Sequence, residues 1–360
     1  MMWMFTAHII TWWIVPEDKW IYYIIYPIID FIGASGFLFI SGISTALSYN
    51  NRKIKAQNDD NYNEKMIRNE YFIRVLLLFI LALLFNIAFG WIWYRKIINL
   101  WRWYFLLTLS FSLLFAWPLL KASKIFRICI GACICIGNKI LIDVLLPYEG
   151  EFNLYGILFY ILYYKVYTDN PILTFFIFFL IGTVFGDIFF EMNQIENRNE
   201  RLTILKKKII IPSSILAPIL ITIGVIFEFP KFFTLRGSLS WSIYCLGLIM
   251  VLITIFISIE NYMTIKTEKS YKFLFYFSYY SLSLFMFHFP LALLFYGKIS
   301  LSYIIFYIVG TIIIVGVFLR FLYKKIEDKY TIFNWKITFS LNTIISRIST
   351  NIVRKKKKLS

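Results

Sequence analysis

Two histidines and one aspartate are the residues of this chain best suited, by type and position, to move a proton. His8 and His288 are the only histidines, and each lies in an apolar stretch, as does Asp30. Ionisable groups are costly at membrane depth and mark functional sites there. An imidazole takes up and returns a proton near neutral pH, and a neighbouring acid can orient it. We therefore predict that His8, His288 and Asp30 are catalytic. The alternative is that each histidine is only hydrogen-bonded within a helical bundle.

A second set of residues suits an anionic ligand. The segment 30–47 has the length of a membrane-crossing helix but is rich in Gly, Ala, Ser and Thr, Ser44 among them. Such small residues let a neighbouring backbone or a ligand come close. The segment leads into a predicted basic loop with Arg52, Lys53 and Lys55. Guanidinium and ammonium groups bind phosphate. No set of metal ligands is predicted.

The composition places these residues in a membrane protein. Hydrophobic residues make up 60% of the 360 residues and charged residues only 16%, and apolar runs of membrane-spanning length recur along the chain. We predict an all-α polytopic membrane helical bundle. The net charge of +17 lies mainly in loops and a tail. This distribution indicates a bilayer with anionic lipid as the partner, and no nucleic acid.

Apolar periodicity predicts ten crossings. Residues 2–15 reach only about 20 Å as a helix, so we expect the chain to begin inside a first transmembrane helix that lacks its N-terminus. Residues 154–167 are short and rich in tyrosine, which predicts a lateral helix at the membrane interface; if they cross, there are 11 crossings. The other predicted spans are 27–47, 71–93, 103–120, 125–146, 171–190, 209–228, 239–259, 273–296 and 302–323.

Charge decides the predicted topology of this integral cell-membrane protein. The basic loops 48–70, 121–124, 191–208 and 260–272 and the tail fall on one side only if 154–167 does not cross. Both termini are then cytoplasmic, residues 1–323 form a transmembrane domain, and residues 324–360 form a basic cytoplasmic tail. Arg95, Lys96 and Arg102 are exceptions on the other side. His8, Asp30 and His288 fall at similar outer depth.

Several motifs resemble the catalytic membrane domain of the heparan-alpha-glucosaminide N-acetyltransferase family. That family has a helix of the type Asp-Phe-x-x-x-x-Phe-Phe-Phe-hydrophobic-Gly-x-Ser before basic residues, matched here by Asp30-Phe31 through Gly42-Ile-Ser44. The segment 169–186 resembles its proline-led helix, in which Gly182 and Gly186 suit helix packing. Residues 281–288 resemble a late helix that ends in histidine. The family's Asp-x-x-Arg-Gly entrance is missing, as is the histidine that animal members carry after the first helix.

The resemblance implies a transmembrane acyl-CoA-dependent acyltransferase. It would move an acyl group, which the family implies is acetyl, from cytoplasmic acyl-CoA to a sugar amine or hydroxyl at the outer face. Acyl-CoA is then a co-substrate and no cofactor is permanently bound. Arg52, Lys53 and Lys55 would hold CoA phosphates, and the small-residue face with Ser44 would admit the pantetheine arm. A histidine would act as a direct general base.

Two other readings stay open. Broken helices and buried acids are also typical of a transporter or flippase for a lipid-linked or small anionic substrate. A related membrane O-acyltransferase would show paired histidines where this chain has His8 alone, and an arginine-rich third helix where it has Arg74 alone. The expected partners are the lipid bilayer, acyl-CoA and a glycan or other outer-face acceptor. A homodimer is also left open.

Overall fold

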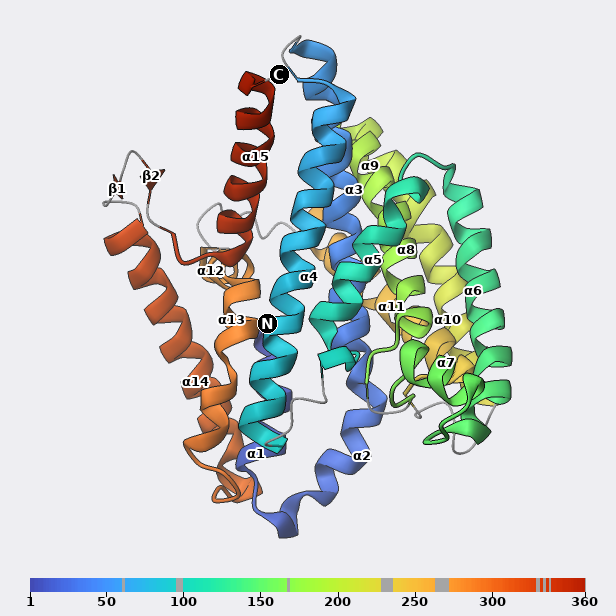
Figure 1. Cartoon of the computed structure of the whole chain (residues 1–360), viewed down its shortest axis with the longest axis vertical. Coiled ribbons are helices and arrows are strands. Elements are labelled where there is room, and N and C mark those ends of the chain that lie inside the picture. The colour runs from blue at the N-terminus through green and yellow to red at the C-terminus, as the bar shows by residue number, and fades with distance from the viewer. Residues whose placement is uncertain are drawn as a thin grey trace. The chain divides into compact units, whose positions relative to one another are not determined.

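The fold divides into two compact units, which are described separately. In a computed structural model of the chain (Figure 1), the first unit combines Met1–Ile29 with Thr264–Ser360, and the second is Asp30–Met263. The structure describes residues 1–59, 62–94, 100–166, 169–227, 236–262, 272–327, 331–332, 335–336 and 338–359. The division of the chain at residue 323 into a transmembrane domain and a basic tail stays a prediction.

The second unit is a bundle of helices that run up and down in succession. The tightest pairings are those of α3 with α8 and of α10 with α11. Its described elements are η2 (Asp30–Ile32), α3 (Ala34–Asn58), α4 (Glu64–Tyr94), α5 (Phe105–Leu119), α6 (Lys124–Leu145), η4 (Leu146–Tyr148), α7 (Leu154–Leu162), α8 (Ile172–Asn193), α9 (Arg198–Leu205), η5 (Lys206–Ile210), α10 (Ile211–Phe227) and α11 (Leu239–Tyr262).

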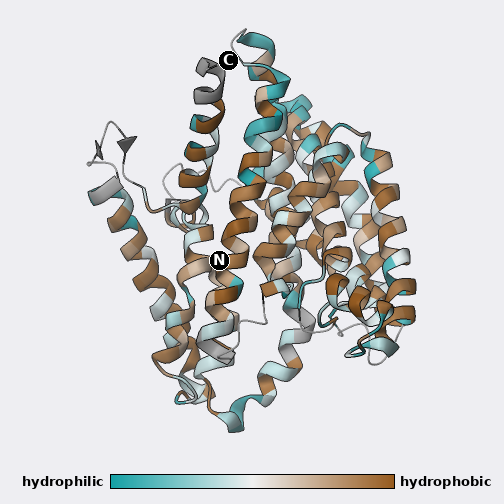
Figure 2. Cartoon of the chain, in the orientation of Figure 1, coloured by the Kyte–Doolittle hydropathy of each residue, from teal (hydrophilic) through white to brown (hydrophobic). Residues whose placement is uncertain are grey.

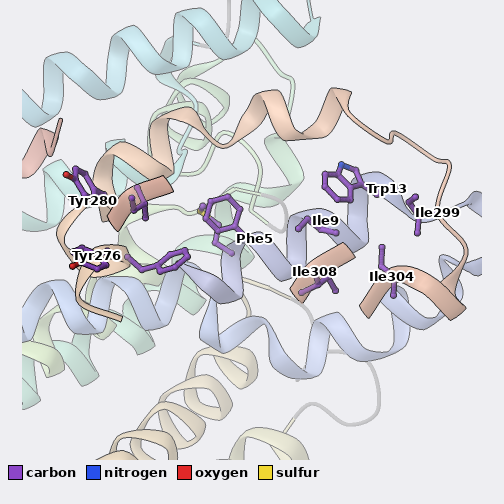
Figure 3. Close-up of a cluster of buried hydrophobic side chains, with 11 residues drawn as sticks. Phe5, Ile9, Trp13, Tyr276, Tyr280, Ile299, Ile304 and Ile308 are labelled. Atoms are coloured by element: carbon purple, nitrogen blue, oxygen red, sulfur yellow. The ribbon is translucent and has the colours of Figure 1, made fainter. Parts of the chain in front are cut away.

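The first unit joins the start of the chain to its end. A core of buried apolar side chains from α1, α12 and α14 holds it together, among them Phe5, Tyr276 and Ile308 (Figure 3). Its described elements are α1 (Met2–Trp13), η1 (Pro16–Asp18), α2 (Trp20–Ile29), α12 (Lys272–Tyr279), α13 (Ser281–Phe287), η6 (Phe289–Leu293), α14 (Leu301–Phe321), η7 (Leu322–Glu327), the antiparallel pair β1 (Thr331–Ile332) and β2 (Trp335–Lys336), and α15 (Leu341–Leu359).

The predicted all-α membrane bundle is confirmed. Seven helices of the described residues are long and apolar enough to cross a bilayer, and Figure 2 shows hydrophobic residues along most of their length. Each of the ten predicted spans coincides with helical structure. The first span and the span 103–120 are shorter helices, α1 and α5, and the span 273–296 is interrupted at Tyr280 and His288. Helix α7 has nine residues, too few to cross.

One prediction about α3 is wrong, and a second is wrong at Gly42 but stays a prediction at Ser44, which lines a cavity. The basic residues Arg52, Lys53 and Lys55 lie inside the helix, which continues to Asn58, and not in a loop. The small-residue face at Gly42 does not admit a ligand, because the backbone of α8 occupies it: a Cβ on Gly42 would lie 2.1 Å from the carbonyl oxygen of Phe179.

The glycines of α8 make the same close approach in return. A Cβ on Gly182 would lie 2.1 Å from the carbonyl oxygen of Phe39, and one on Gly186 would lie 2.6 Å from that of Ile43. Small residues at this spacing let two helix backbones touch. The predicted role of Gly182 and Gly186 in helix packing is therefore confirmed.

Charged residues gather at one end of the second unit, called here the basic end. The ion pairs at this end join Lys121 to Glu64, and both Lys124 and Lys208 to Glu191. The loops after α3, α5 and α8 all lie there, because α7 does not cross. Arg102, an exception to the predicted charge pattern, lies at the opposite end and donates at 3.0 Å to both carboxylate oxygens of buried Asp169. Arg95, Lys96 and the loop residues 263–271 lie outside the described residues.

Candidate functional site

The two histidines meet inside the first unit. The rings of His8 in α1 and His288 after α13 stack with their centroids 4.9 Å apart and their planes 29° apart. His8 is half-buried, and His288 is 2% exposed. The structure thus brings together two of the three residues predicted to be catalytic, although they are far apart in sequence. We call them the histidine pair.

Proline explains why His288 stands at a break. Pro290 has no N–H to donate to the carbonyl four residues earlier and its ring clashes with it, so α13 ends at Phe287 and a 3-10 helix follows from Phe289. The Nδ1 atom of His288 lies 2.6 Å from the carbonyl oxygen of Phe285. A carbonyl only accepts hydrogen bonds, so Nδ1 carries the hydrogen and Nε2 carries the lone pair. Nε2 is buried and has no hydrogen-bond partner among the described residues, which suits a general base.

Backbone hydrogen bonds fix the register of the two segments that carry the pair. The N–H groups of Gly297 and Ile299 donate to the carbonyl oxygens of Trp12 and Trp13, each at 2.8 Å, and Val15 N–H donates to Ile299 at 2.9 Å. The indole Nε1 of Trp13 also donates to Leu291 at 2.7 Å. These contacts tie the end of α1 to the chain that follows His288.

Aromatic rings pack against the histidine pair. Trp12 stacks on His8 at 4.5 Å between ring centroids, and Phe289 lies 4.2 Å from His288. An indole face stabilises a cation that forms next to it, here an imidazolium that has just taken a proton. Sequence reasoning missed Trp12, although its position four residues after His8 places both on one face of a helix.

Asp30 belongs to the second unit and has a partner that was not predicted. Its Oδ2 lies 3.2 Å from Nε of Arg236, and Asp30 is 3% exposed. The other oxygen, Oδ1, is buried and has no hydrogen-bond partner among the described residues. The role of Asp30 in orienting a histidine stays a prediction. The sequence did not indicate a role for Arg236, because this residue lies in the segment between α10 and α11 and belongs to no motif.

A cavity at the basic end of the second unit contains part of the predicted anion-binding set. Its volume is about 120 Å³, and residues of α3, α4 and α5 line it, among them Ser44, Ser48, Arg52, Tyr71, Arg74 and Leu113. We call it the arginine cavity. Positions 44, 48 and 52 lie one turn apart on a single face of α3. Arg74 was not predicted to take part, although its spacing from Tyr71 places both on one face of α4.

The two predicted lysines do not line this cavity. Lys53 is exposed on α3. Lys55 lies over the ring of Tyr62, with Nζ 5.1 Å from the ring centroid. A ligand-binding role for Lys53 and Lys55 stays a prediction. Among the described residues, no three His, Cys, Asp or Glu side chains come together as metal ligands.

Two arginines and one glutamate set the charge around the arginine cavity. Nη1 of Arg52 donates to Oε2 of Glu70 at 2.8 Å, and the Tyr62 hydroxyl donates to the same oxygen at 3.0 Å. Arg74 lies within electrostatic range of both Arg52 and Glu70. Two guanidinium groups and one carboxylate leave a net charge of one positive unit. Guanidinium groups that face a cavity are donors suited to an anion such as phosphate.

The pKa of Tyr62 gives a pH-dependent test of this arrangement. Burial, and next the Glu70 carboxylate, raise its pKa to about 12. Because the folded state holds this proton more tightly than the unfolded state, the stabilisation is complete below the ordinary tyrosine pKa and disappears as pH rises through about 12. We expect wild type to be more stable than Tyr62→Phe by about 0.5–1.5 kcal/mol at pH 8. Melting temperatures at pH 8 and pH 11.5 check this, and an equal difference at both would contradict it.

The long apolar helices define a multi-pass membrane protein, which also contains a cavity lined by two arginines and a stacked pair of histidines. A family model described as "Heparan-alpha-glucosaminide N-acetyltransferase, catalytic" matches residues 1–217 of the 360. The chain therefore belongs to this family of membrane acetyltransferases, as its motifs predicted. The match includes His8 and the whole arginine cavity, and it ends before His288. No curated protein and no solved structure matches the chain.

Proposed function

We propose that this protein is a membrane acyltransferase that moves an acyl group from cytoplasmic acyl-CoA to a sugar amine or hydroxyl at the outer face. The name of the family indicates that this group is acetyl. The arginine cavity carries this proposal. It lies within the family match, and Ser44, Arg52 and Arg74 line it. Guanidinium groups suit the phosphates of CoA because their planar N–H donors match phosphate oxygens.

The histidine pair supplies the chemistry of the transfer. Nε2 of His288 takes the proton of the acceptor amine or hydroxyl while the acceptor attacks the thioester carbonyl. The carbon–sulfur bond then breaks, and the leaving CoA thiolate takes the proton from the His288 imidazolium, so that the base is regenerated and no proton is gained or lost overall. His8 and Trp12 stabilise the imidazolium formed on the way. Acyl transfer to an acceptor of this kind needs no permanently bound cofactor.

Helix α3 supports a division of the reaction between two faces of the membrane. Asp30 comes directly before α3, and Arg52 lies 18 residues after its first residue, a distance of about 27 Å. This is close to the roughly 30 Å of the hydrocarbon core. The basic end would be cytoplasmic by the positive-inside rule, with both termini on that side. Asp30 would then stand at the end of α3 that faces the outer side of the membrane.

The test uses protein purified into lipid nanodiscs. We expect CoA to raise its melting temperature and labelled acetyl-CoA to transfer its acyl group to glucosamine or a glycan. Arg52→Ala should weaken CoA binding by about 10- to 100-fold, the value of a hydrogen bond to a charged group. Arg68→Ala is the matched control, because Arg68 is exposed on α4 and does not line the cavity. Absence of any stabilisation by CoA, together with flux of an anionic solute, would indicate a transporter instead.

A further inference from the structure

The arginine cavity is small for the donor as a whole. Pockets that enclose a drug-sized ligand have about 300–1,000 Å³, and this one has about 120 Å³. A nucleotide therefore does not fit inside, whereas one charged group does. A phosphate in the middle of a chain would need room for covalent neighbours on both sides. The size of the cavity favours a group at the end of a chain.

The donors around the cavity suit a phosphate monoester. Arg52 and Arg74 come from different helices, and Ser44 and Ser48 add hydroxyl groups on one face of α3. A monoester has three terminal oxygens and a charge of about −1.5 to −2 at pH 7. It can therefore take hydrogen bonds from both guanidinium groups at once, with one oxygen left for a serine hydroxyl. A phosphodiester has only two such oxygens and one charge.

Glu70 holds one of these guanidinium groups in place from the neighbouring helix. Its side chain is 4% exposed, and its Oε2 accepts from Nη1 of Arg52 and from the Tyr62 hydroxyl. A guanidinium has five N–H donors in a rigid plane. The bond from Nη1 to Glu70 therefore fixes the direction of the remaining donors, which are available to a ligand. Tyr62, held under Lys55, fixes the carboxylate in turn.

We propose that the arginine cavity binds the single phosphate monoester of the donor, the ribose phosphate of CoA, and that Glu70 and Tyr62 are positioning residues for Arg52. The inference rests on the proposed acyl-CoA donor. Only the ribose phosphate of the donor enters the cavity, and Glu70 and Tyr62 affect its affinity without touching it, because they hold Arg52 in place. The same chemistry would admit a phosphatidate headgroup from the bilayer, and the experiment separates the two sources.

The experiment compares CoA with dephospho-CoA, which lacks only this phosphate. In nanodiscs of phosphatidylcholine, we expect wild-type protein to bind CoA about 10- to 100-fold more tightly, and Arg74→Ala to remove the difference. Glu70→Ala should remove most of the difference in affinity between CoA and dephospho-CoA. Glu70→Gln should keep part of this difference, because the amide oxygen still accepts a hydrogen bond from Arg52. Tyr62→Phe should have a smaller effect in the same direction, and Arg68→Ala none. A general loss of stability would weaken both ligands alike and leave the ratio unchanged.

Several outcomes would overturn the inference. If wild type binds both compounds equally well and still transfers acetyl, the donor's phosphate lies elsewhere while the proposed function stands. If Glu70→Ala keeps the ratio, Glu70 does not position Arg52. If Arg74→Ala removes phosphatidate binding and leaves the preference for CoA over dephospho-CoA unchanged, the cavity serves a lipid. If neither compound binds and no transfer occurs, the proposed function fails as well.

Discussion

Replacement of His288 by glutamine is expected to lower the rate of acyl transfer by about 10²–10⁴-fold, the contribution of a positioned general base. The reason is the state of the imidazole: Nδ1 is engaged by the Phe285 carbonyl, so the lone pair of buried Nε2 remains for a substrate proton. Glutamine keeps a similar length and polarity but cannot take the proton. Single-turnover transfer from saturating acetyl-CoA measures this step.

The affinity for CoA separates a chemical effect from a structural one. His288 and the arginine cavity belong to different units, so His288→Gln should leave the dissociation constant of CoA unchanged while the rate falls. His8→Gln should lower the rate less than His288→Gln, because His8 only stabilises the imidazolium that forms on His288. Trp12→Phe should have a still smaller effect, because phenylalanine keeps an aromatic ring face at this position. Full activity of both histidine variants would show that neither imidazole is the base.

The ten apolar segments could be predicted from the sequence because hydropathy reports burial in lipid directly. The breaks within them could not all be predicted. A window average over 273–296 does not register the interruption at Tyr280. Pro290 did signal the break beside His288, because its chemistry is local. The extension of α3 to Asn58 was missed because charge was read as the end of a helix, whereas a helix that leaves the membrane can continue in water.

The candidate site was predictable to the extent that it depends on single helices. Ser44 and Arg52 share a face of α3, and the histidine pair followed from equal depth in two predicted spans. Glu70 and Arg74 were missed because their role depends on the packing of α4 beside α3. The ion pair between Asp30 and Arg236 joins positions that no sequence pattern relates. Contacts between segments distant in sequence are set by tertiary packing and leave no local periodicity.

Addition of one methyl group to Gly182 is expected to destabilise the second unit by about 3 kcal/mol or more, at the upper end of the cost of overpacking. The new Cβ would lie 2.1 Å from the carbonyl oxygen of Phe39 and 2.9 Å from its carbon. These are backbone atoms, which cannot rotate away as a side chain could. Helix α8 must therefore move away from α3 along the contact. Unfolding of Gly182→Ala in nanodiscs, by heat or denaturant, measures the loss.

A matched glycine provides the control. A Cβ on Gly137 in α6 would meet nothing within 4 Å, so Gly137→Ala should leave stability unchanged or raise it by up to about 1 kcal/mol, through the lower backbone entropy of alanine. Equal stability of the Gly182 and Gly137 variants would show that α3 and α8 are not in backbone contact.

The double variant of Gly42 and Gly182 tests whether the two helices move as rigid bodies. A Cβ on Gly42 would lie 2.1 Å from the carbonyl oxygen of Phe179, across the same contact. Once one substitution has pushed the helices apart, the second methyl group enters space already opened. The combined loss of stability should therefore be smaller than the sum of the two single losses. Because α3 also carries Ser44 and Arg52, the same displacement should weaken CoA binding, whereas Gly137→Ala should leave it unchanged. Additive losses would indicate that each glycine is accommodated by local bending, with the arginine cavity undisturbed.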